Sequence, residues 1–207
     1  MKITWLGHAC FKVEADGYTV VFDPYKDGSV PGLGNVSETA NMVLCSHEHG
    51  DHSGRECVKI TDGTAPFTVT KIETYHDETK GTKRGPNTIH ILDDGTCKVA
   101  HLGDLGCDLE PAQIELLKDM DAVMIPVGGF FTIDAKQAAA LIGEIQPKMA
   151  IPMHFRSDKN MKKNFGYDVI GTVSEFTRLF EDVKVLDESS ADTAEAAAKI
   201  VVLQPAN

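Results

Sequence analysis

Hydrophobic and polar positions alternate along the first part of the chain, which predicts β-strands. Residues 2–22 form two extended segments joined at Asp16-Gly17, and an Asp-Gly pair between β-rich segments predicts a tight hairpin. The second segment stops at Asp23-Pro24, because proline cannot donate a hydrogen bond to a neighbouring strand.

Further strands follow, and several end beside a polar residue. Residues 26–41, which are rich in Gly, Ser and Asn, predict a loop, and residues 42–45 predict a short strand. Residues 67–77 alternate and are β-branched, which predicts a strand that ends at His76. Residues 87–104 predict a second hairpin, which ends at Asp104.

The hydrophobic period changes after residue 110, where helical spacing replaces alternation. Pro111 marks a helix start, and Asp134 is a suitable N-cap for a helix that Pro147 ends. The remaining elements are a strand over 122–127, a strand over 149–155 that carries His154, a helix after Thr172, a short helix or loop over 189–199 and a strand over 199–205. This succession predicts a layered α/β architecture, and we expect one domain over residues 1–207.

Composition narrows the class of protein. With 42% hydrophobic and 25% charged residues, the chain is typical of a soluble globular protein, and it has no apolar run near the roughly 18 residues that span a bilayer. The net charge of -11 argues against nucleic acid as a partner, because nucleic-acid binders usually carry a basic surface. The first residues lack the apolar core of a signal peptide, and five cysteines without a CxxC pair indicate reduced thiols. We therefore expect a cytoplasmic protein.

The segment CSHEHGDHSG, residues 45–54, concentrates imidazole and carboxylate groups. His47 and His49 are two residues apart at the end of an extended segment, so both side chains point to the same side. A glycine then allows the chain to turn, and we expect Asp51 and His52 to lie in the first turn of a helix, aimed at a neighbouring point. Two residues for each of two metal ions is the simplest interpretation.

A metal site needs more than two protein ligands, and further candidates stand at predicted strand ends. They are His76, Asp104 and His154. Imidazole and carboxylate ligands suit Zn, Mn and Fe, of which Zn is the commonest in nitrogen-rich sites. The sequence therefore predicts two divalent metal ions, with zinc expected and manganese or iron as the alternatives.

The pattern resembles the metallo-β-lactamase superfamily. An aspartate after an early strand, the H-x-H-x-D-H motif over residues 47–52, and later single His, Asp and His residues carry a resemblance that covers essentially the whole chain. The segments WLGHACF, RGPNTIHIL, HLGDLG and IPMHF are similar to the lactonase-like branch, which includes ascorbate-6-phosphate lactonase and metal-dependent hydrolases without a known substrate. The resemblance implies a four-layer αβ/βα sandwich with the metals at one edge of the paired sheets.

The same resemblance implies a role for each candidate residue. It assigns His47, His49 and His76 to the first ion and Asp51, His52 and His154 to the second, with Asp104 bridging both. Asp23 is implied to orient a metal ligand through a hydrogen bond, as metal-bound histidines usually require. Asp51 and Asp104 would also act in catalysis, by holding the nucleophile.

Three positions leave alternatives open. His101 competes with His76 as the third ligand of the first ion, and we favour His76 because its strand ends there. His8 lies in a predicted apolar strand, where it is either a hydrogen-bonded core histidine or a catalytic residue that contacts the substrate. Arg84, in KGTKRGPN, is either solvated or binds a phosphate or carboxylate group of the substrate.

Paired metal ions lower the pKa of a shared water toward about 7, which supplies hydroxide for attack on a carbonyl or phosphoryl centre. We therefore expect a dinuclear metal-dependent hydrolase of a small lactone, ester or phosphodiester, with phosphorylated molecules among the candidate substrates. An iron-containing oxidoreductase and a non-catalytic metal-binding module are the alternatives on the same ligands. The leaving-group acid is either a water on the second metal or His8. The physiological substrate and the formation of a homo-oligomer are left open.

Overall fold

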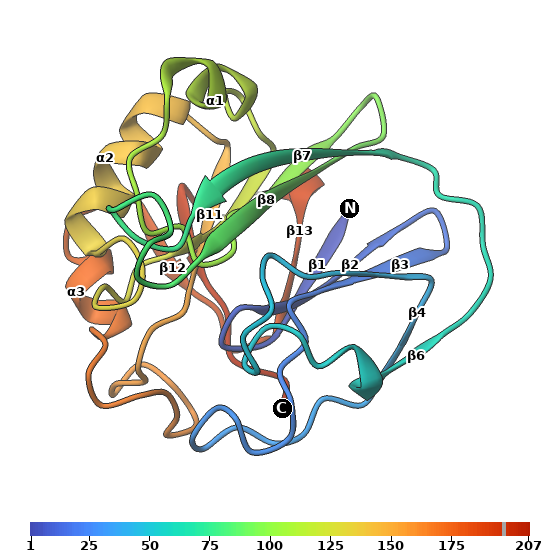
Figure 1. Cartoon of the computed structure of the whole chain (residues 1–207), viewed down its shortest axis with the longest axis horizontal. Coiled ribbons are helices and arrows are strands. Elements are labelled where there is room, and N and C mark those ends of the chain that lie inside the picture. Colours follow the sequence, from blue (N-terminus) through green and yellow to red (C-terminus); the bar gives the residue numbers. More distant parts are fainter. Residues whose placement is uncertain (196–197) are drawn as a thin grey trace.

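Two β-sheets face each other in the computed structural model, which describes residues 1–195 and 198–207 (Figure 1). One sheet has five strands in the order β13-β1-β2-β3-β5, and the other has seven in the order β12-β14-β11-β10-β9-β8-β7. The strands are β1 (Lys2–Gly7), β2 (Cys10–Ala15), β3 (Tyr18–Phe22), β4 (Glu38–Ala40), β5 (Met42–Leu44), β6 (Val58–Ile60), β7 (Thr68–Tyr75), β8 (Pro86–Asp93), β9 (Lys98–His101), β10 (Ala122–Pro126), β11 (Met149–Met153), β12 (Val183–Val185), β13 (Ser190–Asp192) and β14 (Ile200–Val202).

In the five-stranded sheet, β2 and β3 form the hairpin at Asp16-Gly17 that the sequence predicts. The chain before it differs from the prediction, because two strands replace one. β1 ends at Gly7 (φ +126°), and His8 (φ +53°) occupies the turn into β2. The prediction that His8 lies inside a strand is therefore wrong: its left-handed backbone places it in the turn, directly after a register shift between Trp5 and Gly7 in the pairing of β1 with β2.

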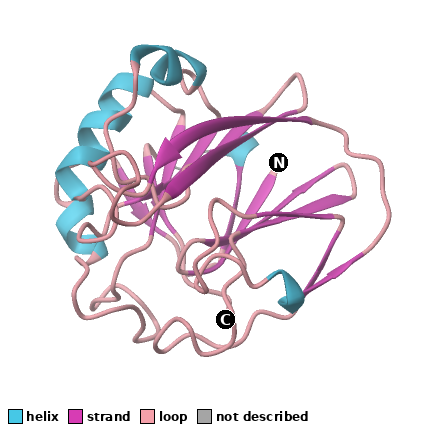
Figure 2. Cartoon of the chain, viewed as in Figure 1, coloured by secondary structure: helices cyan, strands magenta, loops and turns pink. Residues whose placement is uncertain are grey.

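The seven-stranded sheet combines two kinds of connection. Strands β7, β8 and β9 form an antiparallel meander, whereas β9, β10, β11 and β14 run parallel. The parallel strands are linked through helices α1 (Pro111–Leu116), α2 (Ala135–Ile145) and α3 (Val173–Thr177), which gather on one outer side of the molecule (Figure 2). Asp134 caps α2 by accepting hydrogen bonds from the backbone N–H groups of Lys136 and Gln137, in agreement with the prediction.

Apolar side chains from both sheets fill the space between them. Trp5, Phe11 and Phe22 of the first sheet share one buried cluster with Leu92 and Met124 of the second. Such burial is the main favourable contribution to folding, and it also brings the ends of the two sheets together.

The outer face of the five-stranded sheet carries a smaller apolar cluster, which includes Leu6, Val21, Tyr25 and Val58. In the described part of the chain, loops, the β4-β6 pair and a 3₁₀ turn, η1 (Arg55–Cys57), cover this cluster. Glycine and proline in residues 28–34 disfavour a helix there. The α/β sandwich of the prediction is confirmed, with an irregular outer layer on this side.

Two local predictions are wrong. Asp51 and His52 lie in a turn instead of a helix, because Gly54 donates a backbone hydrogen bond to Pro24 O and the 50–54 segment packs against residues 24–26. β4 interrupts the predicted 26–41 loop. The 189–199 segment, left as a short helix or loop, begins with β13 and the 3₁₀ turn η2 (Thr193–Glu195), and its residues 196–197 lie outside the described residues.

Among the described residues, no helix is both long and apolar enough to cross a membrane. The five cysteines are free thiols, and each is buried or half-buried.

Truncation of the shared core should destabilise the fold. Leu92→Ala removes a fully buried side chain, and we expect the free energy of unfolding to fall by about 2–5 kcal/mol in urea denaturation. Leu116→Ala removes a side chain that is 52% exposed and should change this free energy by less than about 0.5 kcal/mol. Equal losses in the two variants would contradict this description of the core.

Candidate metal centre

Both sheets contribute polar side chains to one site, each just beyond the carboxyl end of a strand. The five-stranded sheet supplies His8 after β1, Asp23 after β3 and residues 47–52 after β5. The seven-stranded sheet supplies His76 after β7, Asp104 after β9 and His154 after β11. The site therefore exists only when the two sheets are packed against each other.

The backbone is left-handed at three of these strand ends. His8, Asp23 and His154 have φ values of +53°, +42° and +51°. Non-glycine residues rarely adopt this conformation, and such strain collects at functional sites where the surrounding packing enforces it. Here the left-handed backbone turns each side chain from the strand end into the space between the sheets.

Three groups of side chains have candidate ligand atoms within 4.8 Å of one another, and the third, Asp23, His47 and His52, overlaps the other two. The first group is His47, His49 and His76, and the second is His8, Asp51, His52 and His154. Asp104 lies between them. Its Oδ2 atom is 3.2 Å from Nε2 of His52, of His76 and of His154, and 4.0 Å from Nε2 of His47.

His47, His52 and His76 each form a hydrogen bond through Nδ1, the ring nitrogen directed away from Asp104. This bond fixes the tautomer of the neutral imidazole. Asp23 Oδ2 lies 2.7 Å from His52 Nδ1, and a carboxylate can only accept, so Nδ1 carries the proton. Ser46 Oγ donates to Asp23 Oδ2 at 2.6 Å and therefore accepts from His47 Nδ1 at 2.9 Å. The backbone carbonyl of Phe131 accepts from His76 Nδ1 at 3.1 Å.

In their neutral form, His47, His52 and His76 consequently direct Nε2 lone pairs at the carboxylate of Asp104. His47 Nε2, His52 Nε2 and Asp104 Oδ1 are buried without a hydrogen-bond partner in the described structure. Lone pairs directed at one another repel unless a cation lies between them, and an unpartnered buried polar atom is costly. The donor set of imidazole nitrogens and carboxylate oxygens therefore fits a divalent metal ion.

The pKa values reflect the same crowding of charge. Burial raises the pKa of Asp104, but the imidazoles of His154 and His52 outweigh it and hold this pKa well below its usual range. Burial, together with the neighbouring His52, lowers the pKa of His47 to about 3. Burial lowers the pKa of His52, but the carboxylates of Asp104 and Asp23 outweigh it and raise this pKa well above its usual value. A proton on His52 and a metal ion thus compete for the same carboxylate.

Asp23 is fully buried and accepts hydrogen bonds on both oxygens, since the Ser46 backbone N–H also donates to its Oδ1 at 2.6 Å. Burial raises the pKa of Asp23, but His52 and His101 outweigh it and lower this pKa to about 2. Asp23 is therefore ionised at neutral pH and orients one imidazole of each group, His52 directly and His47 through Ser46.

Two residues that the sequence did not single out hold Asp104 in place. Asn87, fully buried in β8, accepts from the Asp104 backbone N–H at 2.9 Å and donates to Leu102 O at 3.0 Å. Gly103 has φ +56°, and a Cβ there would lie 2.3 Å from Asn87 Oδ1 and 2.4 Å from Ser46 Cβ. Only glycine fits this turn.

A cavity of about 440 Å³ opens over the two groups. Its lining residues are His49, Asp51, His76, Lys83, Arg84, Asp104, Phe131, His154 and Tyr167. Arg84 lies over the Phe131 ring, with Cζ 5.5 Å from the ring centroid. The cavity thus combines the predicted metal ligands with cationic and aromatic side chains, of which Phe131 and Tyr167 were not predicted.

The loop that carries Lys83 and Arg84 is organised by Asp77. This carboxylate accepts hydrogen bonds from the backbone N–H groups of Thr79, Gly81, Lys83 and Arg84 and from the Thr79 hydroxyl. Burial raises the pKa of Asp77, but these hydrogen bonds outweigh it and hold the pKa well below its usual range. The two cations are therefore presented at the cavity by an ordered backbone.

The two histidines that the sequence left open, His101 and His8, differ in their surroundings. His101 donates from Nε2 to Ala9 O at 2.8 Å, accepts from the Gly103 backbone N–H at 3.2 Å and stacks on Phe22, so both ring nitrogens have partners in the core. His8 is fully buried, with Nε2 3.4 Å from Asp51 Oδ2, and lies behind the residues that line the cavity. It contacts a candidate ligand, Asp51, and is not among the residues that line the cavity, which favours a buried histidine among the two alternatives that the sequence leaves open.

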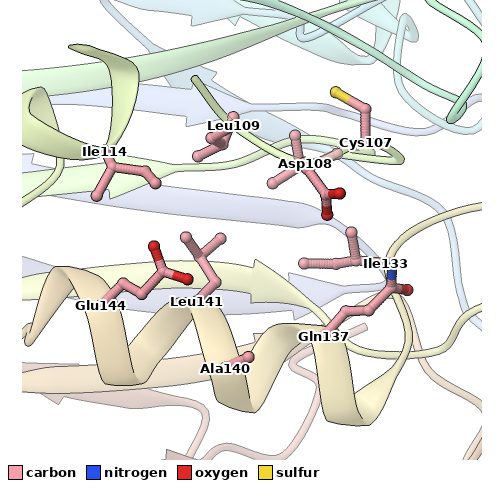
Figure 3. A pocket seen from close by; sticks show the side chains of 10 residues that line it. Cys107, Asp108, Leu109, Ile114, Ile133, Gln137, Ala140, Leu141 and Glu144 are labelled. Carbon is pink, nitrogen blue, oxygen red and sulfur yellow. The ribbon is translucent and has the colours of Figure 1, made fainter. Parts of the chain in front are cut away.

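A second cavity, of about 200 Å³, lies between α2 and the 105–114 segment (Figure 3). Leu109, Ile114, Ile133 and Leu141 give it a mainly apolar wall, and none of the predicted metal ligands is among its lining residues. The predicted metal ligands therefore border the cavity over the histidines and not this one.

Comparison with known proteins agrees with this geometry. The family model described as the β-lactamase superfamily domain matches residues 2–154, and a Thermotoga maritima protein of the metallo-β-lactamase superfamily is 31% identical, with a TM-score of 0.75 over 98% of each chain. The chain belongs to the metallo-β-lactamase superfamily. This confirms the family and the fold class predicted from the sequence.

Two of three further similar proteins are named as hydrolases. A UPF0173 metal-dependent hydrolase from Hyperthermus butylicus is 27% identical over 98% of this chain and 96% of its own length. A UPF0173 protein from Pyrococcus furiosus is 33% identical over 75% of this chain and 83% of its own length. A metallo hydrolase from Ignicoccus hospitalis, at 19% identity and a TM-score of 0.65, shares the fold.

Removal of the shared orienting carboxylate should weaken metal binding. Asp23→Ala deprives His52 and, through Ser46, His47 of their orientation, and we expect metal affinity to fall by about 10–100-fold. Competition with a chromogenic chelator measures this affinity. Asp62→Ala, which removes an exposed carboxylate in the loop after β6, is the control and should bind metal like the wild type. Unchanged affinity in a folded Asp23→Ala variant would show that this hydrogen-bond network is dispensable.

Proposed function

We propose that the protein is a dinuclear metal-dependent hydrolase of a small anionic lactone, ester or phosphodiester. The observation that carries the proposal is the convergence of imidazole Nε2 atoms from both sheets on the Asp104 carboxylate. The names of the superfamily relatives support hydrolysis, and the similarity of several segments to the lactonase-like branch supports a lactone or ester.

Two metal positions follow from the two groups of side chains. His47, His49 and His76 would hold one ion, and Asp51, His52 and His154 would hold the other, with Asp104 bridging them. Zinc suits this mixture of nitrogen and oxygen donors, with manganese and iron as the alternatives. A purely structural zinc uses four closed protein ligands, whereas these groups border an open cavity, which favours catalysis.

When bound, paired divalent ions lower the pKa of a water molecule toward about 7 and stabilise negative charge on a substrate oxygen. The protein's own contribution is to position the groups around them. Asp104 fixes the midpoint between the two groups, and Asp51 borders the cavity beside it. The buried His8, 3.4 Å from Asp51, holds that carboxylate in place instead of contacting the substrate.

Lys83 and Arg84 supply the recognition of an anionic group. Both line the cavity, and Asp77 accepts from the backbone N–H groups of both residues, which fixes their loop. The planar guanidinium of Arg84 suits two oxygens of a carboxylate or phosphate. The volume of about 440 Å³ suits a small molecule, and the cytoplasmic location stays a prediction from the sequence.

Loss of one histidine should abolish both metal binding and turnover. His49 is exposed, so His49→Ala should keep the fold. The variant should bind fewer than two metal ions per chain, and it should not hydrolyse the substrate. Elemental analysis, circular dichroism and assays on phosphodiester and lactone panels measure these properties. The neighbouring Glu48→Ala, which removes an exposed carboxylate paired with Arg55, should retain metal and activity. Full turnover by His49→Ala would refute the proposal, and redox activity with tightly bound iron would favour an oxidoreductase.

Removal of Arg84 should affect anionic substrates selectively. For Arg84→Ala we expect KM to rise about tenfold or more for a substrate with a carboxylate or phosphate, because a charge-assisted hydrogen bond is lost. The KM of a neutral ester should stay within about twofold, since it never used this bond. Lys118→Ala, which removes a surface cation paired with Glu115, is the control. Equal effects on charged and neutral substrates would contradict the assignment of Arg84.

A further inference from the structure

Tyr167 reaches the candidate site from a loop between β11 and α3. Its side chain is half-buried and lines the cavity together with Asp51 and His154. The ring packs edge-on against His8, with centroids 5.7 Å apart, and against Phe131, at 6.1 Å. These contacts fix the phenol at the border between the second group of candidate ligands and the open cavity.

The phenolic hydroxyl faces two acceptors with a single proton. Tyr167 Oη is 2.7 Å from the carbonyl oxygen of Ser29 and 3.2 Å from Oδ2 of Asp51. A hydroxyl donates one hydrogen bond at a time and can rotate to a new acceptor. A substrate oxygen bound beside Asp51 would therefore accept a hydrogen bond from Tyr167 Oη without movement of the tyrosine ring.

The other hydrogen-bond donors that line the cavity have other roles under the proposed function. Arg84 lies over the Phe131 ring, Lys83 and Arg84 are assigned to the anionic group of the substrate, and the imidazoles serve the metal ions under the proposed function. Among the described residues that line the cavity, Tyr167 alone carries a neutral hydroxyl. Phe131 contacts both Arg84 and Tyr167, so a substrate lying across its ring would place its anionic group and its reacting oxygen at opposite ends.

We propose that Tyr167 is the acid that protonates the leaving-group oxygen, an assignment that rests on the proposed hydrolase function. The bond from the carbonyl carbon or phosphorus to this oxygen breaks, and its electron pair moves onto the oxygen. That oxygen takes the phenolic proton and leaves as an alcohol. The phenolate then recovers a proton from solvent, which balances the proton that the attacking water released.

This role differs from a structural one in its dependence on the leaving group. A good leaving group, such as p-nitrophenolate, departs without protonation, whereas an alkoxide needs the acid. Loss of the phenolic hydroxyl should therefore cost little for the first substrate and much for the second. A hydroxyl that only positions Asp51 would affect all substrates equally.

The test compares the wild type and Tyr167→Phe on esters or phosphodiesters that share one acyl or phosphoryl group and differ in the acidity of the leaving alcohol. We expect kcat/KM of the variant to fall by about 100-fold or more for alkyl leaving groups and less than about threefold for p-nitrophenol. Tyr18→Phe, a change at the start of β3 and at the opposite end of that strand from Asp23, should match the wild type throughout. Elemental analysis should find equal metal content in all three proteins.

The outcomes separate the two proposals. Turnover by the wild type with a parallel loss across the series in Tyr167→Phe would overturn the assignment of Tyr167 and leave the hydrolase proposal intact. A loss of metal in Tyr167→Phe would also overturn it, because the phenol would then act on the metal centre. Absence of wild-type turnover with zinc, manganese or iron loaded would overturn both proposals.

Discussion

The carboxylate of Asp104 meets imidazole nitrogens from both sheets, and the arrangement of the site depends on this contact. His52 comes from the five-stranded sheet, whereas His76 and His154 come from the seven-stranded sheet, and each Nε2 lies 3.2 Å from the same Asp104 oxygen. When neutral, the imidazoles of His52 and His76 carry the proton on Nδ1 and present Nε2 lone pairs to this carboxylate. This arrangement is favourable with cations between the groups and costly without them. Metal binding should therefore also stabilise the packing of one sheet on the other.

Buried polar groups behind the ligands maintain this geometry. Asp23 and Ser46 fix two imidazoles, Asn87 fixes the turn that carries Asp104, and Asp77 fixes the loop that carries Arg84. Each of these groups has its hydrogen bonds satisfied by nearby backbone or side chains, so it can be buried at little cost. These hydrogen-bonded groups at the strand ends thus hold the residues that line the cavity in place.

The sequence predicted the residues that gather at the candidate site better than it predicted their surroundings. His76, Asp104 and His154 could be predicted because each is a titratable residue where an alternating or apolar strand ends, and the hairpin at Asp16-Gly17 and α2 have local signals. Ser46 and Asn87 could not be predicted, because their roles depend on hydrogen bonds that form only after the sheets pack. Tyr167 stands 116 residues from Asp51, and no local pattern relates the two. The turn at His8 was missed since apolar neighbours imitate a continuous strand.

Anomalous diffraction from a zinc-loaded crystal tests the central claim most directly. The account predicts two peaks per chain about 3.5–4 Å apart, one beside His47, His49 and His76 and the other beside Asp51, His52 and His154, with the Asp104 carboxylate between them. A single peak, or peaks away from Asp104, would contradict a dinuclear centre built by both sheets.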